Sequence, residues 1–144
     1  MNDAFQADGV VDIMNVTLVP FGNARFSPSG NRLLTTCNDD MLRVFDGNGE
    51  GSKWSLTRAF KHNNKTGRYL TPFQAEFARG SEEVVLSGSL EHPRGVDVFR
   101  VDGGEQPRMD EEENVTAVVS LFAQHPTRNV LVASNASGKC LVWR

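Results

Sequence analysis

ARFSPSGNRLLTTCNDDMLRVFD, residues 24 to 46, and FAQHPTRNVLVASNASGKCLVWR, residues 122 to 144, align without a gap at an offset of 98. In both segments a proline stands at the same place, an aliphatic run follows, and an aromatic residue closes the unit. A third, less regular copy lies between them. The closing aromatic residues are Phe45, Phe99 and Trp143, with spacings of 54 and 44 residues. Periods in this range predict propeller blades rather than helical repeats.

The local patterns predict β-strands. Val84 to Leu86 and Leu131 to Ala133 are short apolar runs bounded by turn residues, as expected of strands covered on both faces. In the segments 42–44 and 96–98 apolar residues alternate with charged ones, so we expect one dry face and one wet face there. No amphipathic helix of useful length is present. The predicted class is therefore all-β, with another β-sandwich as the alternative.

The length of the chain conflicts with a closed ring. Propellers usually have about four to eight blades of roughly 40 to 50 residues, and 144 residues hold about three. The predicted organisation is an atypical N-terminal segment 1–22 followed by blades at about 23–62, 63–104 and 105–144. We therefore expect an incomplete propeller, the C-terminal part of a larger ring. A composition with 39% hydrophobic and 23% charged residues is ordinary for a globular domain.

Several functional classes find no support in the sequence. No stretch approaches the roughly 20 apolar residues of a membrane span, and no signal peptide is predicted. Cys37 and Cys140 form neither a disulfide framework nor a metal-binding pattern. His62, His92 and His125 lie beside turn residues without a catalytic partner motif. The sequence therefore predicts no enzyme activity, cofactor, metal, membrane partner or small-molecule substrate.

One segment departs from the acidic character of the chain, whose net charge is −3. Between residues 53 and 69 there is no acidic residue, and basic and aromatic side chains gather: Lys53, Trp54, Arg58, Phe60, Lys61, His62, Lys65, Arg68 and Tyr69. Clustered Lys and Arg bind phosphates, and an aromatic tip can stack on bases or wedge between them. The equal alternative is a solvated linker between blades whose aromatic residues pack into the core.

Four motifs carry a family resemblance. They are HNNKTGRYLTPFQA (62–75), GSLEHPRGVDVF (88–99), HPTR (125–128) and NASGK (135–139). Together they resemble the C-terminal blades of the WD repeat-containing protein 76 family, whose fungal members are called changed-mutation-rate, or DNA damage-binding, proteins. The segment ARFSPSGNRLLTT is also similar to the related damaged-DNA-binding protein subunit two. The resemblance covers residues 23–144.

The resemblance implies a nuclear, seven-bladed propeller that binds damaged double-stranded DNA and acts in genome maintenance. In the related damaged-DNA-binding protein a hairpin inserts into the duplex at the lesion. By resemblance, its tip corresponds here to Gly67, Arg68 and Tyr69, with Tyr69 as the wedge. Four basic residues of the same rim are implied to contact phosphates: Lys61, Lys65, Arg68 and Arg94. Lesion preference would follow from the lower cost of deforming a weakened duplex.

The resemblance also implies protein partners, namely chromatin and the adaptor of a cullin-four ubiquitin ligase. Docking to the adaptor uses a WD-x-Arg box, which is not intact here: residues 45–48 end in Asn, and residues 142–144 stop too early. Two alternatives to DNA binding remain at this point. One is a protein-interaction scaffold of the substrate-receptor type without direct DNA binding, and the other is an inert truncated product.

Overall fold

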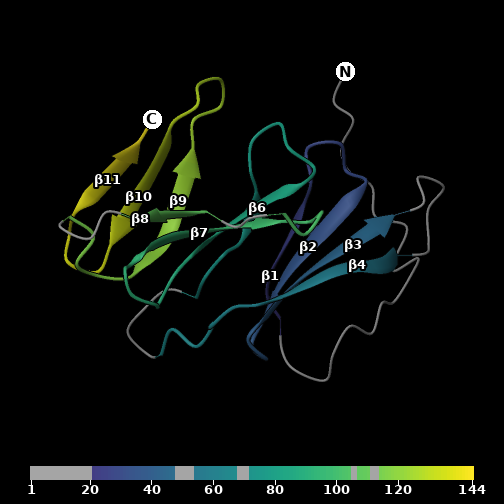
Figure 1. Ribbon diagram of the computed structural model, residues 1–144, viewed down its shortest axis with the longest axis horizontal. Coiled ribbons are helices and arrows are strands. Elements are labelled where there is room, and N and C mark those ends of the chain that lie inside the picture. The colour runs from purple at the N-terminus through teal and green to yellow at the C-terminus, as the bar shows by residue number, and fades with distance from the viewer. Residues whose placement is uncertain (1–20, 48–53, 68–71, 105–106, 111–113) are drawn as a thin grey trace, which may run out of the picture.

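The structure is a computed structural model that describes residues 21–47, 54–67, 72–104, 107–110 and 114–144. These residues form eleven β-strands and no helix, so the all-β class is confirmed. The strands make three antiparallel sheets that stand one beside the next along the molecule (Figure 1). In the described part of the chain there is accordingly no helix long and apolar enough to cross a membrane.

Each sheet is a meander in which consecutive strands are neighbours. The first sheet consists of β1 (Phe21–Phe26), β2 (Arg32–Cys37), β3 (Met41–Gly47) and β4 (Trp54–Lys61). The second consists of β5 (Glu76–Phe77), β6 (Val84–Gly88), β7 (Gly95–Arg100) and β8 (Arg108–Asp110). The third consists of β9 (Val119–Gln124), β10 (Leu131–Asn135) and β11 (Cys140–Trp143). This arrangement is that of consecutive propeller blades.

The sequence repeat is preserved in the backbone. β1 and β9 have the same length and differ in position by the offset of 98 residues. The turn that follows β2 places Asp40 at φ 60°, and the corresponding turn after β10 places Gly138 at φ 80°. Both turns need a left-handed residue, which Gly adopts freely and Asp tolerates better than most residues.

Two hydrophobic clusters fill the spaces between the sheets. The first joins the first and second sheets and includes Leu42, Val44, Val85 and Phe99. The second joins the second and third sheets. It contains Leu86, Val96, Val115, Val119, Leu131, Ala133 and Leu141. The middle sheet is therefore covered on both faces.

This double coverage corrects one expectation from the sequence. The alternation in residues 96–98 predicted a dry face and a wet face, but Val96 faces the third sheet while Phe99 packs toward the first. The charged residue of the pattern, Asp97, is half-buried rather than solvated. Alternation indicates which side chains share a face of the sheet. Whether another sheet covers the second face depends on residues far away in the sequence.

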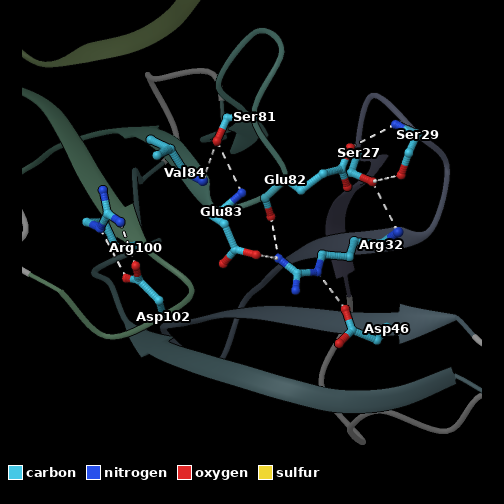
Figure 2. A network of polar contacts seen from close by, with 10 residues as sticks. All are labelled: Ser27, Ser29, Arg32, Asp46, Ser81, Glu82, Glu83, Val84, Arg100 and Asp102. Carbon is cyan, nitrogen blue, oxygen red and sulfur yellow. Dashed lines mark hydrogen bonds and ion pairs between the residues drawn. The ribbon is translucent and has the colours of Figure 1, made fainter.

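A polar network joins the first and second sheets at the edge that carries the loop after β1 and the loop after β5 (Figure 2). Arg32 Nε donates to Asp46 Oδ1 at 2.6 Å within the first sheet. Its Nη1 donates to Glu83 Oε1 of the second sheet at 2.7 Å. The amide of Ser29 donates to Glu82 Oε1 at 2.9 Å. One guanidinium thus holds together two sheets that are also joined by the apolar cluster.

The two end faces of the stack remain partly apolar. On the first sheet the side chains of Phe26 and Leu56 are 63% and 56% exposed, and on the third sheet Val142 is 53% exposed. In repeat folds each unit buries its apolar face against a neighbouring unit. The outer faces therefore have the character of blade surfaces that pair with further blades.

Some expectations concern positions that the structure places elsewhere or does not describe. β8 pairs with β7, so residues 108–110 belong to the second sheet, although the sequence analysis assigned them to the third unit. An antiparallel partner decides that membership, and the sequence of this three-residue strand gives no local signal for it. Of the atypical segment 1–22, residues 21 and 22 begin β1, and the rest lies outside the described residues, as do the acidic residues 111–113.

Candidate functional site

Three of the described connections meet at one edge of the first two sheets. In an antiparallel meander the turn after the second strand and the connection after the fourth strand emerge at the same end. These ends of the strands in the first two sheets therefore carry the turn 38–40, the segment 62–67 that follows β4, and the loop 89–94 between β6 and β7. We call this the loop edge.

The segment 62–67 is fixed on the turn of its own sheet. The amide of His62 donates to the carbonyl oxygen of Asp40 at 3.0 Å, and the amide of Asn64 donates to the Asp40 carboxylate at 3.0 Å. The side-chain nitrogen of Asn64 donates to the carbonyl oxygen of Cys37 at 2.7 Å. Asp40, whose φ is 60°, therefore accepts hydrogen bonds from this segment with both its carbonyl oxygen and its carboxylate.

The same segment reaches the second sheet through His62. This side chain is buried, and its Nε2 lies 2.8 Å from the carbonyl oxygen of Gly88 and 3.5 Å from Asp97 Oδ2. The rings of Phe73 and Phe99 lie edge-on to the imidazole at centroid distances of 5.3 Å and 5.8 Å. The imidazole is thus enclosed between the two sheets.

Asp97 is the acidic centre of this junction. Its Oδ1 accepts a hydrogen bond from Arg108 Nε at 2.5 Å. Burial works against ionisation of the carboxyl group, but hydrogen bonds from His62 and Ser89 together with the Arg108 charge outweigh it, and the pKa of Asp97 is lowered. The carboxylate is therefore kept charged by its partners.

A pocket of about 220 Å³ opens at this junction. Lys61 and Asn63 contribute from the first sheet, and Glu91, Asp97 and Arg108 contribute from the second. Its lining is mostly polar and contains both signs of charge. The arrangement can bind a ligand through hydrogen bonds and charge, but among the described residues no nucleophile is paired with a base in the manner of a catalytic site.

The structure brings some of the predicted site residues to the loop edge. Lys61 is the last residue of β4, is exposed and lines the pocket. Lys65 is exposed, and Gly67 is exposed with φ at 76°. Arg94 lies in the loop before β7, where its Nη1 donates to the carbonyl oxygen of Leu90 at 3.3 Å. All four stand on the same edge.

The two remaining predicted residues, Arg68 and Tyr69, lie outside the described residues. Their assignment as hairpin tip and wedge stays a prediction. The described part of the segment ends at Gly67, whose left-handed backbone is suited to a change of chain direction before them.

Positive charge at the loop edge is partly compensated. Lys65 Nζ lies 3.1 Å from Asp40 Oδ2, and Arg108 is bound to Asp97. Among the described residues neither Lys61 nor Arg94 takes part in an ion pair. These two cations are therefore the ones best placed to meet a phosphate.

Sequence reasoning missed the buried polar residues of this junction. His62 was noted only as lying beside a turn, and Asp97 only as the wet member of an alternating strand. Asp97 directly follows Val96, which is fully buried, and an acid between two valines of a middle strand is the one local signal that could have indicated a partner.

Comparison with known proteins gives the relatives of the chain. No protein-family model matches it. It is 43% identical over 122 residues to WD repeat-containing protein 76 of Xenopus laevis, which covers 84% of this chain and 21% of the relative. The protein of the same name from Mus musculus is also 43% identical over 122 residues, covering 84% of this chain and 20% of the relative.

A second group of relatives is named for damaged DNA. Protein DAMAGED DNA-BINDING 2 of Arabidopsis thaliana is 31% identical over 134 residues, covering 85% of this chain and 23% of the relative. The chain thus spans about a fifth of the length of the curated relatives it matches.

Proposed function

Since the chain belongs to the WD repeat-containing protein 76 family, we propose that it binds duplex DNA through the loop edge, with preference for damaged sites, as part of a nuclear response to DNA damage. The observation that carries the proposal is the meeting of the segment 62–67 with the loop 89–94, which puts Lys61 and Arg94 on one edge. The name of the Arabidopsis relative supports a damaged-DNA partner.

Each residue has a distinct proposed role. Lys61, Lys65 and Arg94 contact phosphates, and Lys65 exchanges its ion pair with Asp40 for one with the DNA. Gly67 permits the change of chain direction that presents Arg68 to the backbone and Tyr69 to the base stack. Insertion of an aromatic side chain costs a few kcal/mol of unstacking per base step. The cost is lower where a lesion has already weakened stacking, so lesion preference needs no reading of base edges.

The rest of the proposed architecture concerns the longer protein. We propose that the three sheets are blades of a seven-bladed ring, with β8 in the second blade, and that the exposed apolar faces are covered by its other blades. Chromatin and a cullin-four ubiquitin-ligase adaptor are the proposed protein partners. For the adaptor, Asp46 of the incomplete box at residues 45–48 is already bound to Arg32, so docking through it would require this ion pair to open.

A salt titration tests the DNA proposal. Fluorescence anisotropy of a labelled duplex, with and without a single lesion, is measured against the full chain at several salt concentrations. Affinity is expected to fall steeply with salt, with a slope of about 0.9 per phosphate contacted, and to be higher for the lesion duplex. Affinity that is independent of salt would contradict phosphate contacts.

A protein-interaction scaffold is the second candidate. It is favoured by the mixed charge of the pocket at the loop edge, where Glu91 and Asp97 would repel a phosphate but could receive basic or polar groups of a peptide. The scaffold predicts that the lesion and undamaged duplexes bind equally weakly. An inert product would instead show as aggregation of the purified chain.

A further inference from the structure

Each ring nitrogen of His62 faces an oxygen atom. Nδ1 lies 2.6 Å from Oδ1 of Asn64, and Nε2 lies 2.8 Å from the carbonyl oxygen of Gly88. A carbonyl oxygen can only accept a hydrogen bond, so the contact with Gly88 is favourable only when Nε2 carries a proton. His62 is only 6% exposed, and although it lines the pocket, both of its ring nitrogens already face the oxygen atoms of Asn64 and Gly88.

The Asn64 amide is oriented by two further contacts. Its Nδ2 donates to the carbonyl oxygens of Cys37 at 2.7 Å and Met41 at 3.2 Å. If the amide were turned over, its oxygen would face these two carbonyl oxygens and both hydrogen bonds would be lost. Oδ1 therefore faces His62, and Nδ1 of the imidazole must also be a donor.

A neutral imidazole cannot satisfy both contacts. It carries one N–H and one lone pair, so in either tautomer one buried oxygen would face the lone pair without a hydrogen bond. A buried oxygen left in this way loses its hydration without gaining a hydrogen bond in exchange, which destabilises the folded state. The imidazolium donates from both nitrogens, and the Asp97 carboxylate at 3.5 Å supplies the opposite charge.

The charged groups around the ring come from several elements. Asp97 lies on β7, and Arg108 on β8 binds it from the other side. Asp40 lies on the turn before β3, where its carboxylate holds Lys65. Lys61 and Glu91 line the pocket beside the ring. Of these groups, Asp97 has an oxygen within 4.0 Å of the imidazole.

We propose that His62 is a buried imidazolium and the positioning residue of the segment 62–67: its two donated hydrogen bonds fasten that segment to the first sheet through Asn64 and to the second sheet through Gly88. The consequence for DNA rests on the proposed function, because Lys65 and Gly67 belong to this segment. The protonation state and the fastening do not depend on DNA and are tested without it.

His125 provides an internal reference with the opposite pattern. Its Nδ1 accepts hydrogen bonds from the amides of Thr127 at 3.1 Å and Arg128 at 3.0 Å. This nitrogen therefore needs a free lone pair, and the hydrogen bonds are made by the neutral ring. The two histidines are expected to differ within one sample.

The protonation is measured on the full chain labelled with ¹⁵N in its histidines. Spectra are recorded about one pH unit above the usual titration of an exposed imidazole, which is near 6.5. Single His→Gln variants at 62, 92 and 125 assign the signals. His62 is expected to show a proton on both ring nitrogens, while His125 shows one bare nitrogen. A bare nitrogen on His62 overturns the proposal whatever the DNA assays give.

The fastening is measured by amide hydrogen exchange in the segment. The side chain in His62→Gln has a single amide nitrogen, so it cannot donate hydrogen bonds to both Asn64 and Gly88 from opposite sides as the imidazolium does. The backbone amides of Asn64 and Thr66 are therefore expected to exchange faster. His92→Gln, in the exposed loop before β7, is the control and should leave both rates unchanged. Unchanged exchange in His62→Gln would show that the imidazole does not hold the segment.

A second variant covers the case in which His62→Gln does not fold. Asp97→Asn keeps the shape of the side chain but removes the counter-charge, and His62 is then expected to lose its second proton at the same pH. Retention of both protons in Asp97→Asn would contradict the role of this ion pair. If the imidazolium is present and wild-type chain binds no DNA, the proposed function fails while the assignment of His62 stands.

Discussion

Gly88 lies so close to the backbone of Val119 that a Cβ atom at position 88 would come within 1.9 Å of the Val119 carbonyl oxygen. β6 of the second sheet thus meets β9 of the third without a side chain between them. The Gly88 carbonyl oxygen is also the acceptor of His62, so this one residue contacts elements from all three sheets. The junction therefore depends on the absence of a side chain.

Gly88→Ala is expected to destabilise the fold strongly. The added methyl group meets backbone rather than a movable side chain, so β6 and β9 must separate, at a cost of about 3 kcal/mol or more. Gly22→Ala is the control, because there the nearest atom to an added Cβ is at 3.4 Å, an ordinary contact. Urea denaturation followed by tryptophan fluorescence measures both. Similar midpoints for the two variants would contradict this close approach.

Arg32→Met is expected to lower the free energy of unfolding by about 1 to 3 kcal/mol, since it removes the hydrogen bonds that Arg32 donates to the carboxylates of Asp46 and Glu83. The Arg32 side chain is only 19% exposed. The matched control is Arg100→Met, which breaks an ion pair with Asp102 on a side chain that is 42% exposed. Solvent-exposed ion pairs contribute little to stability, so the control should be nearly neutral. Equal losses would show that the Arg32 network adds nothing beyond a surface pair.

Asp97 is expected to make the stability depend on pH in the acid range. Its pKa is lowered in the folded chain, whereas an unfolded Asp titrates near about 3.9. Its contribution is therefore fully present above the unfolded value and is lost as the pH falls through the folded value. The difference in free energy of unfolding between wild type and Asp97→Asn should shrink from pH 6 toward about pH 2. A constant difference would indicate that the charge of Asp97 is not involved.

Lys61→Glu and Arg94→Glu are expected to weaken DNA binding and to reduce the slope of affinity against salt by about one each. The cause is loss of a phosphate contact at the loop edge. Arg128→Glu makes the same charge change in the loop after β9, at the opposite edge, and is the control. Anisotropy titrations with an undamaged duplex are sufficient. Equal weakening by all three variants would show that the effect comes from the change in net charge rather than from contacts at the loop edge.

Tyr69→Ala is expected to weaken binding to a lesion duplex more than binding to an undamaged one, because only the wedge exploits weakened stacking. Stacking of a base on an aromatic side chain contributes about 1 to 3 kcal/mol. Arg68→Glu, by contrast, should reduce binding to both duplexes. Tyr69→Phe, which retains the ring, serves as the control. If Tyr69→Ala leaves the ratio of the two affinities unchanged, Tyr69 is not the wedge.

Much of the fold could be predicted from local patterns. The offset repeat indicated equivalent strands, and β1 and β9 carry that offset in the structure. Short apolar runs predicted β6 and β10, because strand formation and turn chemistry depend on residues close together in the chain. The placement of β8 was wrong, since a three-residue outer strand is defined by its partner rather than by its own sequence.

The candidate site was predictable only in part. Charge clustering and family resemblance indicated Lys61, Lys65 and Arg94, which do lie on one edge, although Lys65 is paired with Asp40. The buried imidazole of His62 and its partner Asp97 were not predicted. Exposed basic residues can be predicted from the local composition of the sequence. A buried polar residue is recognised only through the hydrogen-bond partner that the folded structure brings to it.

The sequence by itself determined that the chain folds into three consecutive β-units of the propeller type, because the repeat spacing, the apolar periods and the turn residues are all local. Only the tertiary structure decided how those units are joined. His62 reaches Gly88 across 26 residues, and Gly88 meets Val119 on the next sheet. Such contacts arise where two packed sheets bring backbone and side chain together, and that proximity depends on the combined geometry of all the strands rather than on any one segment.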